Sequence, residues 1–217
     1  FLGARDIVGG VNWVQTVKED PNVAKLVEKG KKQFAGTEIM GKKIGVIGLG
    51  AIGVLVANAC VALGMEVYGY DPFISVDAAW NLSKDIKHIA NVEDIYANCD
   101  YITVHVPLMD STKKMINADA FAKMKDGVII INNSRGPLIV EQDLYDALES
   151  GKVAAAAVDV VSTEPIKKDN VLLKAKNCII TPHISWATKE ARERIMNTTA
   201  ENIKSVIDGA PQNVVNK

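Results

Sequence analysis

Cysteine is scarce in this chain, and its placement excludes two common uses of the residue. The three cysteines, Cys60, Cys99 and Cys178, are far apart, odd in number and form no Cys-x-x-Cys pair. This pattern predicts reduced, buried thiols in a cytoplasmic protein. It argues against a disulfide framework and against a metal site, so we expect no bound metal.

The chain also lacks an excess of charge of either sign. Its 25 Lys and Arg residues nearly balance 26 Asp and Glu residues, for a formal net charge of -1. That balance argues against general nucleic-acid binding and against a polybasic membrane-binding surface. The sequence shows no internal repeat and no signal peptide. Its 217 residues, 48% of them hydrophobic, suffice for one domain with a sizeable core.

Long uncharged runs are rare, and only residues 44–65 are long enough to cross a bilayer. A membrane helix would explain neither the glycines in the first half of this run nor the strand-like sequence that follows it. A strand, a glycine turn and a helix explain both. We therefore favour a β-turn-α-β unit over a membrane helix for this stretch.

The turn of that unit carries the pattern Gly-x-Gly-x-x-Gly at Gly48, Gly50 and Gly53. Residues 44–47 are an apolar, β-branched run typical of a buried parallel strand, and residues 51–63 have the length of a helix. The first glycine permits a tight turn, the second lets backbone N–H groups approach a pyrophosphate, and the third lets helix and strand pack closely. The helix N-terminus adds unpaired N–H donors and partial positive charge. The motif predicts a dinucleotide site.

An acidic residue follows the motif at the position where a ribose contact is expected. The predicted strand 66–70 ends at Asp71, 18 positions after Gly53. A carboxylate there accepts hydrogen bonds from ribose hydroxyls and repels the 2′-phosphate of NADP. No Arg occurs in residues 72–75 to receive such a phosphate. The sequence therefore predicts NAD as the cofactor.

Short predicted strands alternate with predicted helices along the rest of the chain. Further strands are expected at 85–89, 101–106, 128–131, 153–158 and 178–181. Helices are expected over 1–32, with an interruption near Pro21, and at 92–97, 118–124, 138–149 and 188–207. The alternation predicts an α/β fold with a doubly wound, mostly parallel sheet of Rossmann type and about seven strands. The opening at Phe1, in an apparent mid-helix, suggests a single-domain fragment.

Seven polar residues fall at or just past the predicted ends of strands, where ligands gather in open α/β sheets. They are Asp71, His105, Ser134, Arg135, Asp159, Glu164 and His183. We expect them to converge on one crevice. His88, among charged neighbours, is instead expected to be a solvated surface residue.

A crevice that holds NAD with Arg, Glu and His suggests hydride transfer to or from a carboxylate-bearing alcohol. Arg135 can hold a carboxylate as a bidentate fork. His183 can exchange the proton that accompanies the hydride. Glu164 can hydrogen-bond the imidazole and favour its protonated form. Each residue also has a structural interpretation, as an ion pair, a capping or core histidine, and a loop carboxylate respectively.

At these residues the chain resembles the NAD-binding domain of the D-isomer-specific 2-hydroxyacid dehydrogenases. The matching segments, in family order, are 48–53, Ser134-Arg135-Gly136, Ala157-Val158-Asp159-Val160 with Glu164-Pro165, and Thr181-Pro182-His183-Ile184. The resemblance implies catalytic roles for Arg135, Glu164 and His183. It implies cofactor contacts at Gly48, Gly50, Ala51, Ile52, Gly53, Asp71, Val106, Pro107, Asn133, Ser134, Asp159 and Ser185.

Within that family the chain is most similar to the enzymes that oxidise 3-phosphoglycerate to 3-phosphohydroxypyruvate in serine biosynthesis. The similar segments are 34–38, 69–72, 99–105 and 213–216. Residues 184–188 depart from that pattern, and Trp186 is similar to the hydroxypyruvate (glycerate) reductases. Reduction of hydroxypyruvate is therefore the alternative activity. A nucleotide-sensing, corepressor-like binding protein is a further alternative, because such proteins share this domain and its catalytic trio.

The resemblance also implies an organisation and partners. Residues 1–217 would form the NAD-binding domain, with substrate-domain segments before residue 1 and after residue 217. We expect such a fragment to bind NAD with little or no turnover. The expected partners are a small 2-hydroxy or 2-oxo acid and a second copy in a homodimer, with no nucleic acid and no membrane.

Overall fold

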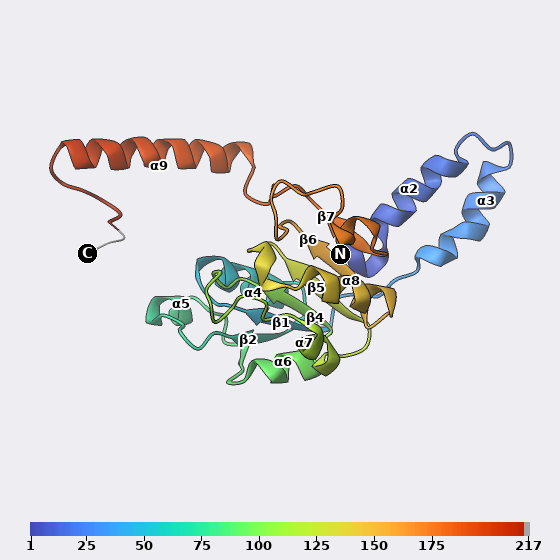
Figure 1. The fold of residues 1–217 in the computed structure, drawn as a ribbon, viewed down its shortest axis with the longest axis horizontal. Coiled ribbons are helices and arrows are strands. Elements are labelled where there is room, and N and C mark those ends of the chain that lie inside the picture. The colour runs from blue at the N-terminus through green and yellow to red at the C-terminus, as the bar shows by residue number, and fades with distance from the viewer. Residues whose placement is uncertain (215–217) are drawn as a thin grey trace. The chain divides into compact units, whose positions relative to one another are not determined.

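The computed structural model describes residues 1–214 (Figure 1). These residues divide into two compact units, Phe1–Pro182 and a second unit that begins at His183. Val215 and Asn216, which belong to the closing segment compared above, lie outside the described residues.

A seven-stranded sheet organises the first unit. Its strand order is β3-β2-β1-β4-β5-β6-β7, and every neighbouring pair is parallel. The strands are β1 (Lys43–Ile47), β2 (Glu66–Tyr70), β3 (Lys87–His88), β4 (Tyr101–Val104), β5 (Val128–Asn132), β6 (Val153–Val158) and β7 (Cys178–Ile180). This order confirms the predicted doubly wound α/β fold. Because Ile47 pairs with both Tyr70 and Val104, the three central strands end at one level.

Helices cover the two faces of the sheet, and the alternation of side chains along each strand separates two cores. Val46 of β1 packs with Val54 and Ala57 of α4 (Ala51–Ala62). The next residue, Ile47, joins the other core, which is closed by α6 (Val92–Asn98), α7 (Ala118–Lys123) and α8 (Glu141–Glu149). The uncharged run 44–65 is thus β1, a turn and α4. Within the described residues, no helix has both the length and the hydropathy needed to span a bilayer.

Short polar side chains fix where several helices begin. Asn91, Asn117 and Thr188 each accept a backbone N–H bond at the start of α6, α7 and α9 (Lys189–Ile207), respectively. Such N-caps satisfy donors that the first helical turn leaves without partners. Ser75 does the same for α5 (Val76–Trp80), a short helix that the sequence analysis did not predict.

Several predicted boundaries were wrong. The predicted strand 101–106 ends at Val104, and the predicted strand 85–89 is reduced to β3, whose His88 is exposed as expected. The predicted helix 138–149 begins only at Glu141, after the 3-10 turn η2 (Gly136–Leu138) and two extended residues. A second 3-10 turn that was not predicted, η3 (Val171–Lys174), follows β6.

The predicted opening helix is broken into separate pieces. They are α1 (Leu2–Arg5), α2 (Ile7–Val17), α3 (Val23–Gly30) and the 3-10 turn η1 (Lys31–Phe34). Asp6 adopts a left-handed conformation with φ 43° and accepts the Gly9 N–H at 3.1 Å, so it ends one helix and caps the next. In the second unit, α9 matches the predicted helix 188–207, but Ile195, Ile203 and Val206 of its apolar face are exposed.

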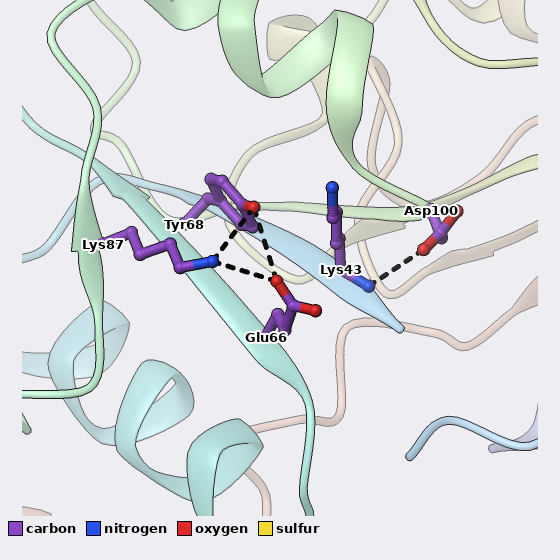
Figure 2. A network of polar contacts seen from close by, with 5 residues as sticks. All are labelled: Lys43, Glu66, Tyr68, Lys87 and Asp100. Atoms are coloured by element: carbon purple, nitrogen blue, oxygen red, sulfur yellow. Dashed lines mark hydrogen bonds and ion pairs between the residues drawn. The ribbon is translucent and has the colours of Figure 1, made fainter. Parts of the chain in front are cut away.

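A polar network lies at the amino ends of the central strands, opposite the ends where ligands are expected (Figure 2). Lys87 Nζ lies 3.0 Å from Glu66 Oε2, and the ammonium groups of Lys43 and Lys87 lie 5.7 and 5.0 Å from the centre of the Tyr68 ring. Asp100 accepts the Lys43 N–H at 2.9 Å. These contacts join β1, β2, β3 and the residue before β4.

Candidate functional site

The glycine turn between β1 and α4 has no room for side chains at two of its three glycines. Gly48 has φ +96°, and a Cβ there would lie 2.7 Å from the His105 carbonyl carbon. A Cβ at Gly53 would lie 1.9 Å from the Gly48 oxygen. Gly50 differs, because a Cβ there would meet nothing within 4 Å. The turn is therefore packed on its inner side and open at Gly50, where a ligand can approach the backbone.

The N-terminus of α4 supplies hydrogen-bond donors at that open side. Gly50 is the N-cap residue, and as a glycine it has no side chain to accept a backbone N–H of the first turn. The first-turn N–H groups, including those of Ala51 and Ile52, have no acceptor within the helix. Both residues are exposed. This arrangement suits a diphosphate, which carries the charge that a helix N-terminus favours.

Asp71, just past β2, is held against the glycine turn. Its Oδ2 accepts the Leu49 N–H and its Oδ1 accepts the Phe73 N–H, both at 2.8 Å. Each carboxylate oxygen keeps further acceptor capacity, and the side chain is only half-buried. The residue is thus a fixed acceptor that can still receive ribose hydroxyls.

A cavity of about 850 Å³ opens beside this turn and is the place where a dinucleotide would lie. Five residues that were assigned to the cofactor from the sequence line it: Gly48, Gly50, Asp71, Val106 and Pro107. Residues of α6 and α7 supply a further part of its wall. Burial, with smaller effects of Tyr70 and Glu93, raises the pKa of the Tyr96 hydroxyl in that wall to about 12.

His105 lines the cavity, and its backbone adjoins Gly48 of the glycine turn. Its Nε2 is 3.0 Å from Thr103 Oγ1, and burial lowers the pKa of its imidazole. The ring therefore favours its neutral form in the folded protein. Of the seven residues expected to converge, His105 and Asp71 thus line one cavity. That the other five share it stays a prediction.

Two features of this region were not predicted from the sequence: the part of the cavity wall formed by α6 and α7, and the hydrogen bonds of Thr112 that fix the loop after Pro107. Thr112 Oγ1 donates to the Pro107 carbonyl at 2.6 Å and accepts the Met109 N–H at 2.9 Å. Thr side chains can bond backbone groups three or four residues earlier, but this general tendency does not single out Thr112 in the sequence. Nothing in the local sequence marks Tyr96 as a cavity residue.

The turn after β5 presents Arg135. Asn132, which is buried, accepts the Ser134 N–H at 3.1 Å and donates to the Arg135 carbonyl at 3.0 Å. Ser134 Oγ donates to the Val106 carbonyl at 2.9 Å, which ties this turn to the end of β4. Arg135 and Asn133 are exposed. The guanidinium is therefore carried on a braced backbone and remains accessible.

The segment that carries Glu164 packs against the Arg135 turn. A Cβ at Gly136 would lie 2.0 Å from the Val161 carbonyl carbon, so the two backbones touch. The Val161 N–H donates to Glu164 Oε1 at 3.2 Å. The structure thus brings the Arg135 and Glu164 segments together through Val161.

Asp159 closes this group at the end of β6. It is buried, and its Oδ1 accepts the Thr181 hydroxyl at 2.5 Å. Its backbone N–H donates to the Asn132 carbonyl at 3.0 Å. The Asp159 backbone thus adjoins the end of β5, and its carboxylate adjoins Thr181. Its contact with a nicotinamide stays a prediction.

His183 and Ser185 belong to the second unit, whereas Arg135 and Glu164 belong to the first. His183 has φ 55°, a left-handed conformation that few residues other than Gly adopt, although Asn, Asp and His adopt it more often than the rest. The expected meeting of His183 with Arg135 and Glu164 stays a prediction. Among the described residues, no group of three or more His, Cys, Asp or Glu side chains is arranged to hold a metal.

The parallel sheet, the glycine turn open at a helix N-terminus, the fixed acceptor Asp71 and the adjoining cavity fit a dinucleotide. Together they define an NAD-binding domain of the Rossmann type.

The chain belongs to the D-isomer specific 2-hydroxyacid dehydrogenase family, whose NAD binding domain model matches residues 7–185. It is 53% identical to a hydroxypyruvate reductase of Blautia hydrogenotrophica over 180 residues, and this matched region covers 83% of this chain and 55% of that protein. It is 44% identical over 200 residues to a D-3-phosphoglycerate dehydrogenase of Archaeoglobus fulgidus, covering 90% of this chain and 37% of that protein.

Solved structures agree with this assignment. The NAD-dependent formate dehydrogenase of Staphylococcus aureus in complex with NAD superposes with a TM-score of 0.82 at 25% identity, covering 100% of this chain and 62% of that chain. The chain spans about half the length, or less, of the two curated relatives.

Proposed function

We propose that this chain is the nucleotide-binding part of an NAD-dependent oxidoreductase that interconverts a D-2-hydroxy acid and its 2-oxo acid. The observation that carries the proposal is the extent of the family match, residues 7–185. That range includes the glycine turn and all three proposed catalytic residues, Arg135, Glu164 and His183.

The chain's own residues would divide the work in the following way. NAD, when bound, supplies the hydride acceptor or donor. The backbone N–H groups of Ala51 and Ile52 would bind its pyrophosphate, and Asp71 would bind the adenosine ribose. Asp159 would contact the nicotinamide carboxamide. Asn133, Ser134 and Ser185 are further proposed cofactor contacts. Val106 and Pro107 would contact the adenine side.

The substrate would be held and protonated by the catalytic trio. Arg135, exposed on its braced turn, would bind the substrate carboxylate through two parallel N–H bonds. His183 would give a proton to the 2-oxo group during reduction and take it from the 2-hydroxyl during oxidation. Glu164 would orient the imidazole. Holding the reacting groups in one geometry in this way is itself a large part of catalysis.

Hydroxypyruvate, reduced to D-glycerate, is the substrate that the comparisons favour. Identity to the hydroxypyruvate reductase, 53%, exceeds identity to the phosphoglycerate dehydrogenase, 44%. Trp186, two positions after Ile184, also follows the reductase pattern noted in the sequence. Oxidation of 3-phosphoglycerate, which the sequence analysis placed first, becomes the second candidate.

A substrate panel on the full-length enzyme tests these proposals. We expect the enzyme to oxidise NADH in the presence of hydroxypyruvate, and to do so more slowly with 3-phosphohydroxypyruvate. The reverse reaction is assayed with NAD and either D-glycerate or 3-phosphoglycerate. L-Glycerate is the stereochemical control. Preference for the phosphorylated pair would reverse the order of the two substrates. NADH binding without turnover of any 2-hydroxy or 2-oxo acid would favour the nucleotide-sensing alternative.

The family resemblance also implies a homodimer, the cysteine pattern predicts a cytoplasmic protein, and the balanced charge argues against nucleic-acid and membrane binding. Each of these stays a prediction. Sedimentation of the purified enzyme at micromolar concentration measures its oligomeric state, and a monomer would contradict the predicted homodimer.

A further inference from the structure

Glu141, the first residue of α8, uses both of its carboxylate oxygens on a segment that comes much later in the chain. Its Oε1 accepts the Ser162 N–H at 2.6 Å. Its Oε2 accepts Asn170 Nδ2 at 3.0 Å. Asn170 in turn accepts the Leu172 N–H at 3.0 Å and caps η3. One side chain thus holds both ends of the segment 162–170.

That segment carries Glu164. Ser162, whose N–H Glu141 binds, directly follows Val161, whose N–H donates to Glu164 Oε1. Val161 is buried and its backbone packs on Gly136, the residue after Arg135. The Glu141 contact therefore lies next to the junction of the two segments that present Arg135 and Glu164.

A simpler interpretation is that Glu141 only complements the dipole of α8, whose first turn favours acidic residues. Asp143 in the same turn also fills that role, and its Oδ2 accepts the Ala118 N–H at 2.8 Å. A dipole effect does not require that both oxygens of Glu141 be bonded to a single loop. Two charge-assisted hydrogen bonds to that loop fix its geometry instead.

We propose that Glu141 is a positioning residue for the reaction, one that fixes the segment 162–170 so that Glu164 is held beside the Arg135 turn. The inference rests on the proposed function. Glu141 would not contact substrate or cofactor. Its loss should lower turnover, because small misplacement of catalytic groups is costly, while the glycine turn and NADH affinity stay intact.

The chain offers a matched control at the other end of the same helix. Glu149 accepts the Lys176 N–H at 3.2 Å and pairs with Lys176 Nζ at 3.2 Å. Like Glu141, it joins α8 to a later backbone N–H, but it lies at the far end of the helix from Glu164. Glu149→Ala removes a comparable contact without touching the segment 162–170.

The experiment compares Glu141→Ala, Glu141→Gln and Glu149→Ala in the full-length enzyme. We expect kcat to fall at least about tenfold in Glu141→Ala, with the NADH dissociation constant changed by less than about twofold. Glu141→Gln keeps an oxygen that can accept the Ser162 N–H, so it should recover part of kcat. Glu149→Ala should retain wild-type kcat even where its Tm falls. Wild-type kcat in Glu141→Ala, or an equal loss in Glu149→Ala, would overturn the proposal.

Amide hydrogen exchange separates this inference from the proposed function. If the wild-type enzyme turns over no acid, the proposed function fails. Loss of protection at Ser162 in Glu141→Ala, a smaller loss in Glu141→Gln and no loss in Glu149→Ala would still support the role of Glu141 in fixing the segment 162–170. Unchanged protection overturns it. The Gln variant also serves if the Ala variant does not fold.

Discussion

The carboxylate of Asp71 accepts the backbone N–H of Leu49, which lies between the first two glycines of the turn, at 2.8 Å. The residue expected to select the adenosine ribose therefore also fixes the shape of the turn that would receive the pyrophosphate. The two parts of the nucleotide site are mechanically linked through one side chain.

Replacing Asp71 should weaken cofactor binding and narrow the preference for NAD. Asp71→Ala removes an acceptor for ribose and leaves the Leu49 N–H without its carboxylate partner. Hydrogen bonds to charged groups contribute about 1.5–3 kcal/mol, so NADH affinity should fall at least about tenfold. Titration calorimetry with NADH and NADPH measures both effects, with the exposed Asp77→Ala as control. An unchanged preference would place discrimination elsewhere.

Two glycines of one motif should respond differently to alanine. Gly53→Ala would put a Cβ 1.9 Å from the Gly48 oxygen, so it should lower Tm and abolish NADH binding together. Gly50→Ala meets nothing within 4 Å and has φ −73°, so Tm should hold while NADH affinity falls. Scanning calorimetry and NADH titration on both variants decide this. Full affinity in Gly50→Ala would mean that no ligand approaches that face.

His183 should affect turnover without affecting NADH affinity. Asn tolerates the left-handed conformation of this position better than Ala, so His183→Asn isolates loss of the imidazole. Acid–base catalysis contributes about 10²–10⁴-fold, and kcat should fall within that range. Steady-state kinetics and NADH titration on the full-length enzyme measure the two quantities. Unaltered kcat would remove His183 from the proposed role.

Asp100 should make stability depend on pH below neutrality. Burial opposes its charge, but the hydrogen bonds from Lys125 and from the Lys43 N–H outweigh burial and lower the pKa of this carboxyl. Its contribution is thus present above the ordinary Asp pKa of about 4 and is lost as pH falls through the lowered value. Asp100→Asn should be less stable than wild type at neutral pH, and the difference should shrink as pH falls below the ordinary Asp pKa of about 4. Urea unfolding at several pH values tests this, with Asp110→Asn as control. A constant difference would refute the linkage.

The fold could be predicted from sequence because its signals are local and periodic. The apolar runs at β1, β4 and β5 and the intervening helices gave the parallel sheet, and the glycine spacing gave the turn. The wrong predictions concern the boundaries of strands and helices, where the periodic pattern of apolar residues ends. The helix α8 begins only at Glu141 because Ile139 is extended and forms a parallel bridge with Ile116, to whose carbonyl the Val140 N–H donates.

Long-range polar contacts were beyond sequence reasoning. Asp71 was identified by its distance from the glycines, but its bond to Leu49 follows from three-dimensional packing of β2 beside β1. Glu141 reads in sequence as an ordinary acidic residue of a first helical turn, and only the fold brings Ser162 to it. Periodicity reports which face of an element is buried, not which polar atoms meet.

The strand order runs outward from β1 in two directions, through β2 and β3 on one side and β4 to β7 on the other. Asp71 follows the first half of the sheet, while Arg135 and Glu164 follow strands of the second. Substitutions at the proposed acid-binding residues Arg135 and Glu164 can therefore accumulate during evolution without altering the glycine turn or Asp71. Such modularity is how one ancestral scaffold can give rise to enzymes for different acids.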